Sequence, residues 1–326
     1  MKIVVTGSLG NVSKPLVLLL IEQGHQVTVV SSSAARKAAI EQLGAKAAIG
    51  ELEDPIFLTK IFDGHDAAYC MLPPFNFFGD QTLDYQKQAL NISTNYVQAI
   101  QNAGIKRVVQ LSSVGAERPT GAGVLVFHHI AESVFKQLPE DVAVTHLRPG
   151  SFDYNLYAFM DMVKGKGFLK GFIGKLLYLR HYGLKGLFKG YSGIILSNYG
   201  ETDKIAWVSP IDIAFAIAGE ISALRAGKKV RYVASEELTC QEIAAALGKA
   251  IGKPYLKWVL ISNRQMTNAF MQIGASAEIA KAFTEMNAAM HNGSLFEDYF
   301  KNRPAILGKT KINDFAKAFA LKYNEQ

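Results

Sequence analysis

In the first half of the chain, short apolar runs alternate with longer segments in which apolar residues recur at helical spacing. The apolar runs predict strands near residues 2–6, 27–30, 47–49, 67–72, 108–112 and 143–147. The segments between them predict helices near residues 15–21, 34–43, 85–103 and 128–138, and one that begins at Asp54-Pro55. Repeated strand–helix units with short links favour a parallel sheet covered by helices on both faces.

This alternation ends after Gly150. One more strand is expected near residues 229–233, a helix near 238–248, and mostly helices from Asn263 onward. We therefore predict a Rossmann-type, doubly wound α/β domain over residues 1–150, to which 205–235 returns. Residues 151–204 are expected to form a basic, apolar insertion or lid, and 236–326 a smaller, mostly helical lobe on the substrate side.

A glycine turn joins the first expected strand to the first expected helix. Gly7 allows a tight turn, Gly10 lets the backbone approach a pyrophosphate, and the helix that follows points its free N–H groups at that phosphate. Ser13 stands at the third glycine position of this fingerprint, and we expect its hydroxyl near the phosphates. The turn predicts a phosphate site made by Thr6, Gly7, Ser8, Leu9, Gly10, Asn11 and Val12.

The amino-acid composition indicates the class of protein and its expected cellular compartment. The content of 49% hydrophobic and 19% charged residues is ordinary for a globular protein. Cys70 and Cys240 are far apart, have no metal-ligand spacing, and predict buried thiols in a reducing compartment. No signal-peptide pattern opens the chain, so we expect a cytoplasmic protein.

The net charge of +7 is concentrated between Met162 and Gly200, which hold seven basic and no acidic residues. The lysines of 162–190 alternate with apolar residues, and glycines interrupt the pattern. Three interpretations remain: a lid that attracts an anionic substrate, a segment lying on an anionic membrane surface, or a contact with a partner subunit. No nucleic-acid-binding motif accompanies the charge, so nucleic acid is not an expected partner.

In their order and spacing, several motifs resemble those of NmrA-like proteins, an atypical branch of the short-chain dehydrogenase/reductase superfamily. The resemblance covers almost the whole chain and implies a Rossmann-type domain with a small C-terminal lobe. The matching motifs are Thr6-Gly7-x-x-Gly10, Gly50-Glu51-Leu52-x-Asp54, Leu72-Pro73-Pro74, Leu111-Ser112-Ser113-x-Gly115-Ala116, His128-x-x-x-Glu132, Arg148-Pro149-Gly150-x-Phe152-x-x-Asn155, Trp207-Val208-x-x-x-Asp212-Ile213-Ala214 and Glu242-Ile243-Ala244.

The end of the second strand predicts the cofactor. An NAD site uses an acidic residue there, whereas this chain has Ser31 and Ser32, followed by Arg36 and Lys37. Hydroxyls and cations suit a 2′-phosphate, so NADP(H) is favoured over NAD(H). The alternative is that Arg36 and Lys37 only solvate an exposed helix.

Topology predicts the remaining cofactor contacts, since ligands of open α/β sheets lie at the carboxyl ends of the strands. From the adenine to the nicotinamide, we expect contacts with Leu52, Leu72, Pro73, Ser112, Pro149, Gly150, Ser151 and Phe152.

The expected catalytic helix lacks the Tyr-x-x-x-Lys pair that short-chain reductases commonly use. His128 and Glu132 share one face of that helix, and together with Ser112 they are the candidate catalytic residues. Glu132 is expected to orient His128 or to hold the cofactor. The alternative is that His128 or His129 only caps the helix.

Two functions follow from these features and from the resemblance. The first is an NADPH-dependent oxidoreductase of a quinone or small carbonyl, with Phe75, Phe77 and Phe78 near the ring-binding mouth or packed as core or lid. The second is a non-catalytic NADP(H) redox sensor that acts through a protein partner. An isomerase or epimerase is less favoured because the Tyr is missing.

Overall fold

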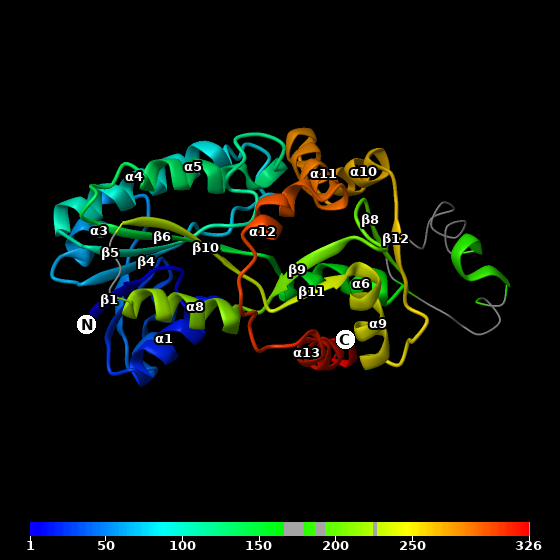
Figure 1. The fold of residues 1–326 in the computed structure, drawn as a ribbon, viewed down its shortest axis with the longest axis horizontal. Coiled ribbons are helices and arrows are strands. Elements are labelled where there is room, and N and C mark those ends of the chain that lie inside the picture. The colour runs from blue at the N-terminus through cyan, green and yellow to red at the C-terminus, as the bar shows by residue number, and fades with distance from the viewer. Residues whose placement is uncertain (166–178, 185, 187–192, 224–226, 326) are drawn as a thin grey trace.

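The computed structural model describes residues 1–165, 179–184, 186, 193–223 and 227–325. Its larger layer is a sheet in which seven of the described strands run parallel (Figure 1). The strand order is β10-β6-β5-β4-β1-β2-β3. The strands are β1 (Lys2–Val5), β2 (Gln26–Ser31), β3 (Lys46–Ile49), β4 (Ala67–Cys70), β5 (Arg107–Leu111), β6 (Ala143–Pro149) and β10 (Lys228–Val233).

Helices cover both faces of this sheet, which confirms the Rossmann-type fold (Figure 1). On one face lie α3 (Pro55–Phe62), α4 (Tyr85–Ala103) and α5 (Val126–Phe135), and they enclose a core that includes Phe62, Tyr96 and Phe135. On the other face α1 (Ser13–Glu22) packs against α8 (Pro210–Ser222). The short α2 (Lys37–Gln42) leads into β3.

A second lobe lies beside the carboxyl ends of the large sheet (Figure 1). It holds a sheet in the order β11-β9-β7 and a parallel pair, β8 with β12. Its strands are β7 (Ser151–Phe152), β8 (Ile195–Ser197), β9 (Lys204–Val208), β11 (Glu236–Thr239) and β12 (Trp258–Leu260). Its helices are α6 (Met160–Val163), α9 (Cys240–Ala250), α10 (Asn263–Gln272), α11 (Ala277–His291), α12 (Glu297–Lys301) and α13 (Ile312–Asn324).

The chain crosses between the two lobes more often than the sequence predicts. Within 205–235, α8 and β10 lie on the large sheet, but β9 lies in the second lobe. The prediction for β9 is therefore wrong, because this strand pairs with β7 on one side and β11 on the other. Hydrogen bonding to β7 and β11 places β9 in the second lobe, although α8 and β10, which follow it in the sequence, lie on the large sheet.

Most of the basic segment 162–190 lies outside the described residues, so its three interpretations stay predictions. The described part of the chain contains no helix long and apolar enough to span a membrane. Cys70 and Cys240 are buried free thiols.

Candidate functional site

The glycine turn between β1 and α1 has the conformation that a phosphate site needs. Gly7 has φ +91°, and a Cβ there would lie 2.2 Å from the Met71 sulfur. Ser8 also has positive φ, at 55°. The Gly10 N–H donates to the Gly7 carbonyl over 3.1 Å and closes the turn. The turn therefore depends on glycine at position 7 for both backbone conformation and space.

The start of α1 fits an anion. Among the described residues, no side chain caps this helix, and its first turn contains no acidic residue. The positive end of the helix dipole therefore faces the carboxyl edge of the sheet without a competing negative group. This is the fit expected for the pyrophosphate of a dinucleotide, held by the backbone of Gly7–Val12.

Ser13 does not face the phosphates, so this expectation is wrong. Its side chain is fully buried, and its hydroxyl donates to the Thr6 carbonyl over 2.9 Å. Thr6 is equally buried: its hydroxyl donates to the Tyr69 carbonyl and accepts from the Met71 N–H. Both hydroxyls therefore fasten the turn to β1 and β4, and neither is free for a ligand.

This fastening lies at the topological switch point of the sheet. β1 has β2 on one side and β4 on the other, so the connections leave toward opposite faces. A crevice forms at such a point beyond the carboxyl ends of the strands, and nucleotides bind there. Leu72 and Pro73 continue the chain directly after β4 along this edge.

The expected adenine end lies at the carboxyl ends of β2 and β3. The Ser8 hydroxyl donates to the Ser31 hydroxyl over 2.9 Å, and the Ser33 N–H also donates to it over 3.2 Å. Ser31 is buried, its hydroxyl accepts twice, and among the residues that the structure describes its own proton has no acceptor. Ser32, Arg36 and Lys37 follow as exposed residues, and within the described ranges neither cation forms an ion pair. Leu52 is partly buried, and its carbonyl accepts from the Asn95 side chain.

Two of the expected site residues, Ser112 and Glu132, meet Arg148 near the ends of β5 and β6, in an arrangement that the sequence did not reveal. The Ser112 hydroxyl donates to Glu132 over 2.6 Å. Arg148 Nε and Nη2 donate to the two oxygens of Glu132, each over 2.8 Å. Although burial raises it, the Arg148 hydrogen bonds and charge hold the pKa of Glu132 below its ordinary value.

Arg148 is the centre of a larger network. Its Nη1 also donates to the Tyr232 hydroxyl (2.9 Å), to Glu117 (3.1 Å) and to Asp298 of α12 (3.3 Å). One buried guanidinium therefore connects β6, α5, β10 and the second lobe. From the sequence, Arg148 is named only as part of a motif. A single Arg near the end of a buried strand was the feature that could have indicated a buried charged network.

His128 is separate from this network. Its Nδ1 is buried, and it has no hydrogen-bond partner in the part of the chain that the structure describes. Burial lowers the pKa of His128 to about 4, against a smaller opposite effect of Glu132. Because the Glu132 carboxylate is occupied by Arg148 and Ser112, it does not orient His128. Its neighbour His129 contacts the Ala116 carbonyl through Nδ1.

At the expected nicotinamide end, β6 continues through Pro149 into β7. A Cβ on Gly150 would lie 2.1 Å from the Ala206 carbonyl oxygen of β9, so this glycine is required by strand packing between the lobes. Ser151 and Phe152 pair with β9, and the Phe152 ring packs 5.2 Å from the Tyr154 ring.

The three phenylalanines after β4 join an aromatic cluster between the lobes. Phe75 packs 5.0 Å from Phe127 of α5, and Phe77 and Phe78 pack 5.2 and 5.4 Å from Phe283 of α11. These contacts hold the loop after β4 against the second lobe. Phe78 keeps 39% of its surface exposed and is the ring of this group most open to a ligand.

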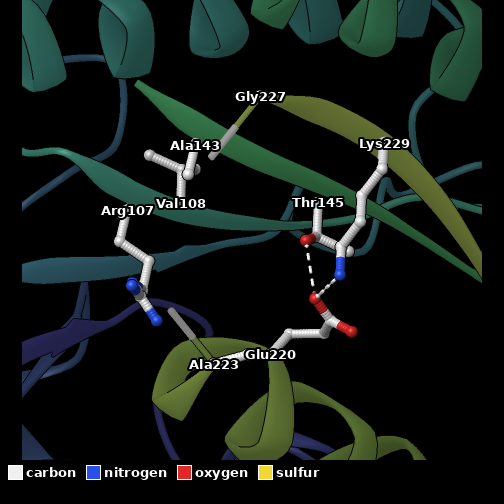
Figure 2. A pocket seen from close by; sticks show the side chains of 8 residues that line it. All are labelled: Arg107, Val108, Ala143, Thr145, Glu220, Ala223, Gly227 and Lys229. Atoms are coloured by element: carbon white, nitrogen blue, oxygen red, sulfur yellow. Dashed lines mark hydrogen bonds and ion pairs between the residues drawn. The ribbon is translucent and has the colours of Figure 1, made fainter. Parts of the chain in front are cut away.

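A small cavity lies at the opposite, amino-terminal edge of the sheet (Figure 2). Glu220 of α8 accepts from Thr145 over 2.9 Å and pairs with Lys229 and Arg231 beside it. These partners neutralise the Glu220 carboxylate, and the cavity is remote from the glycine turn. We assign it to the packing of α8 on the sheet.

Comparisons with known proteins concern the domain that carries this turn. Residues 7–156 match a family described as NAD(P)H-binding. No curated protein sequence matches the chain.

Solved structures share the fold over nearly the full length. An NADPH-dependent quinone oxidoreductase from Escherichia coli is 19% identical, with a TM-score of 0.72, and the match covers 97% of this chain and 99% of that one. Triphenylmethane reductase from Citrobacter sp. is 18% identical, with a TM-score of 0.68 and coverage of 99% and 100%. A nucleoside-diphosphate-sugar epimerase from Staphylococcus aureus is 13% identical, with a TM-score of 0.71 and coverage of 97% and 100%.

The glycine turn, the strand order and the family match agree with one another. Residues 7–156 belong to a Rossmann-type domain and match an NAD(P)H-binding family.

Proposed function

We propose that this protein is an NADPH-dependent oxidoreductase that reduces a quinone or a small carbonyl compound. The observation that carries the cofactor choice is the end of β2, where Ser31 keeps a free hydroxyl proton and the exposed Arg36 follows. A 2′-phosphate has acceptor oxygens and negative charge, so it matches both groups. No carboxylate, which would repel it, follows β2 before Glu41.

A quinone is a suitable substrate because its reduction does not need a strong acid from the protein. When bound, the cofactor supplies a hydride. In the described part of the chain, Glu132 is committed to Arg148 and the Ser112 hydroxyl to Glu132, and His128 loses its proton well below neutral pH, so a strong protein acid is missing from α5. A reduced quinone can take its proton from water, and Phe78 offers a ring face at the edge of the loop after β4. The quinone oxidoreductase of the same fold supports this choice.

The experiment is to follow NADPH oxidation at 340 nm with a panel of quinones and aldehydes. We expect turnover with at least one quinone. Tight NADPH binding without turnover on any acceptor would exclude the enzyme and support the second candidate.

That second candidate is a redox sensor that binds NADP(H) and acts through a protein partner. The same lack of a proton donor on α5 favours it, since a sensor needs only a cofactor site. His128→Ala separates a chemical role from a structural one. Turnover unchanged by this substitution removes His128 from the mechanism.

A further inference from the structure

Asp153 is a buried acid at the junction of the two lobes that neither candidate function uses. It directly follows β7 and begins a short 3₁₀ segment, Asp153–Phe159. Only 8% of its surface is exposed. Within the described residues, it has no ion-pair partner and no side-chain hydrogen bond. By contrast, the buried acids Glu132 and Glu220 are both paired with basic side chains.

The groups that face Asp153 make its negative charge costly. The Tyr154 N–H lies beside its carboxyl, and Tyr154 and Tyr157 face it from its own segment. From α8 it is faced by Asp212, which accepts from the Ser235 hydroxyl over 2.6 Å and from the N–H groups of Lys309 and Thr310. Asp212 is a second acidic group near Asp153, and like charges close together disfavour the charged form of Asp153.

Asp153 lies close to the residues that would hold the cofactor. The neighbouring Tyr154 packs on Phe152 at the expected nicotinamide end and lies near the side chain of Asn11 in the glycine turn. The segment that begins with Asp153 therefore lies beside the phosphate turn and follows shortly after the carboxyl end of β6. The nicotinamide ring is expected at this edge. Its oxidised form carries one more positive charge than its reduced form.

We propose that Asp153 holds a proton in the cofactor-free protein and with NADPH, and releases it to solvent when NADP⁺ binds. The proposal rests on the proposed NADP(H) site. The preference of the protein for NADP⁺ over NADPH then rises with pH. Such a link couples cofactor redox state to pH whether the protein acts as enzyme or as sensor.

The physical cause is the missing counter-charge. Burial, with a smaller contribution from Asp212, raises the pKa of Asp153 to about 7. A cationic nicotinamide ring supplies the positive charge that the site lacks and so lowers this pKa, whereas the neutral ring of NADPH does not. By linkage, the proton released on binding makes NADP⁺ affinity pH-dependent.

The test is to measure the dissociation constants of NADP⁺ and NADPH between pH 5.5 and 8.5 by calorimetry. For the wild type we expect the ratio Kd(NADPH)/Kd(NADP⁺) to rise roughly tenfold across this range, the factor that corresponds to one unit of pKa change. In Asp153→Asn the ratio should be flat. Asp161→Asn, which removes an exposed acid on α6, is the matched control and should retain the wild-type slope.

An infrared measurement tests Asp153 without any cofactor. The carbonyl band of a protonated carboxyl should be present at pH 6 in the wild type and absent from Asp153→Asn. An ionised Asp153 at pH 6, or equal slopes in the wild type and Asp153→Asn, overturns the proposal. If neither nucleotide binds the folded protein, the proposed function fails, and the release of a proton to NADP⁺ fails with it; the infrared band still shows whether Asp153 is protonated.

Discussion

Arg148 donates two hydrogen bonds of 2.8 Å to Glu132, one to each carboxylate oxygen, and both side chains are almost fully buried. This bidentate geometry is the strongest form of a charged hydrogen bond. It also decides the state of Ser112: an ionised Glu132 can only accept, so the Ser112 hydroxyl must donate to it. Glu132 and Ser112, two of the three candidate catalytic residues, thereby join α5 to β5 and β6 through Arg148.

Removing one partner of this pair should destabilise the protein strongly. We expect Glu132→Gln to cost about 3 kcal/mol of unfolding free energy, because the buried Arg148 then faces a neutral amide. Urea denaturation followed by circular dichroism measures the loss. The double variant Arg148→Met/Glu132→Leu serves as the control and should lose less than Glu132→Gln, since it leaves no unpaired charge buried. A larger loss in the double variant contradicts this account.

Gly7 and Gly24 offer a matched pair for the glycine turn. Both have positive φ, 91° and 80°, but a Cβ on Gly7 would meet Met71, while one on Gly24 has nothing within 4 Å. Gly24→Ala should cost only the backbone strain, about 1 kcal/mol. Gly7→Ala should lower the melting temperature further and weaken NADPH binding at least tenfold. Equal effects of the two substitutions on nucleotide affinity would mean that the turn does not hold the phosphates.

Arg36 tests the choice between the two dinucleotides. If its guanidinium pairs with the 2′-phosphate, Arg36→Ala should weaken NADPH binding by about 2 kcal/mol and leave NADH nearly unchanged. Lys60→Ala removes another exposed cation, on α3, and controls for general electrostatic attraction. Fluorescence titration with both nucleotides gives the two affinities. Equal loss for NADPH and NADH disproves the 2′-phosphate contact.

The local features of this site were readable from the sequence, and the long-range ones were not. The strand, glycine turn and helix of residues 2–22 form from neighbours in sequence, and their pattern predicted them. By contrast, the bond from Arg148 to Asp298 and the close approach of Gly150 to Ala206 each join residues from separate elements. Periodicity carries no information on such pairings, because they depend on how the two lobes pack.

Asp153 makes a prediction for stability that is independent of the cofactor. Its pKa is raised from 3.8 to about 7 in the folded protein, so at intermediate pH the folded state binds more protons than the unfolded state. Stability must then fall as pH rises from about 4 to 7, and the cost of the buried charge is full above pH 7. We expect Asp153→Asn to be more stable than the wild type by about 1–3 kcal/mol at pH 8, and to lose this advantage at pH 5. Urea unfolding at both pH values measures the difference, and a stabilisation that is the same at pH 5 and pH 8 would show that Asp153 does not carry the proton.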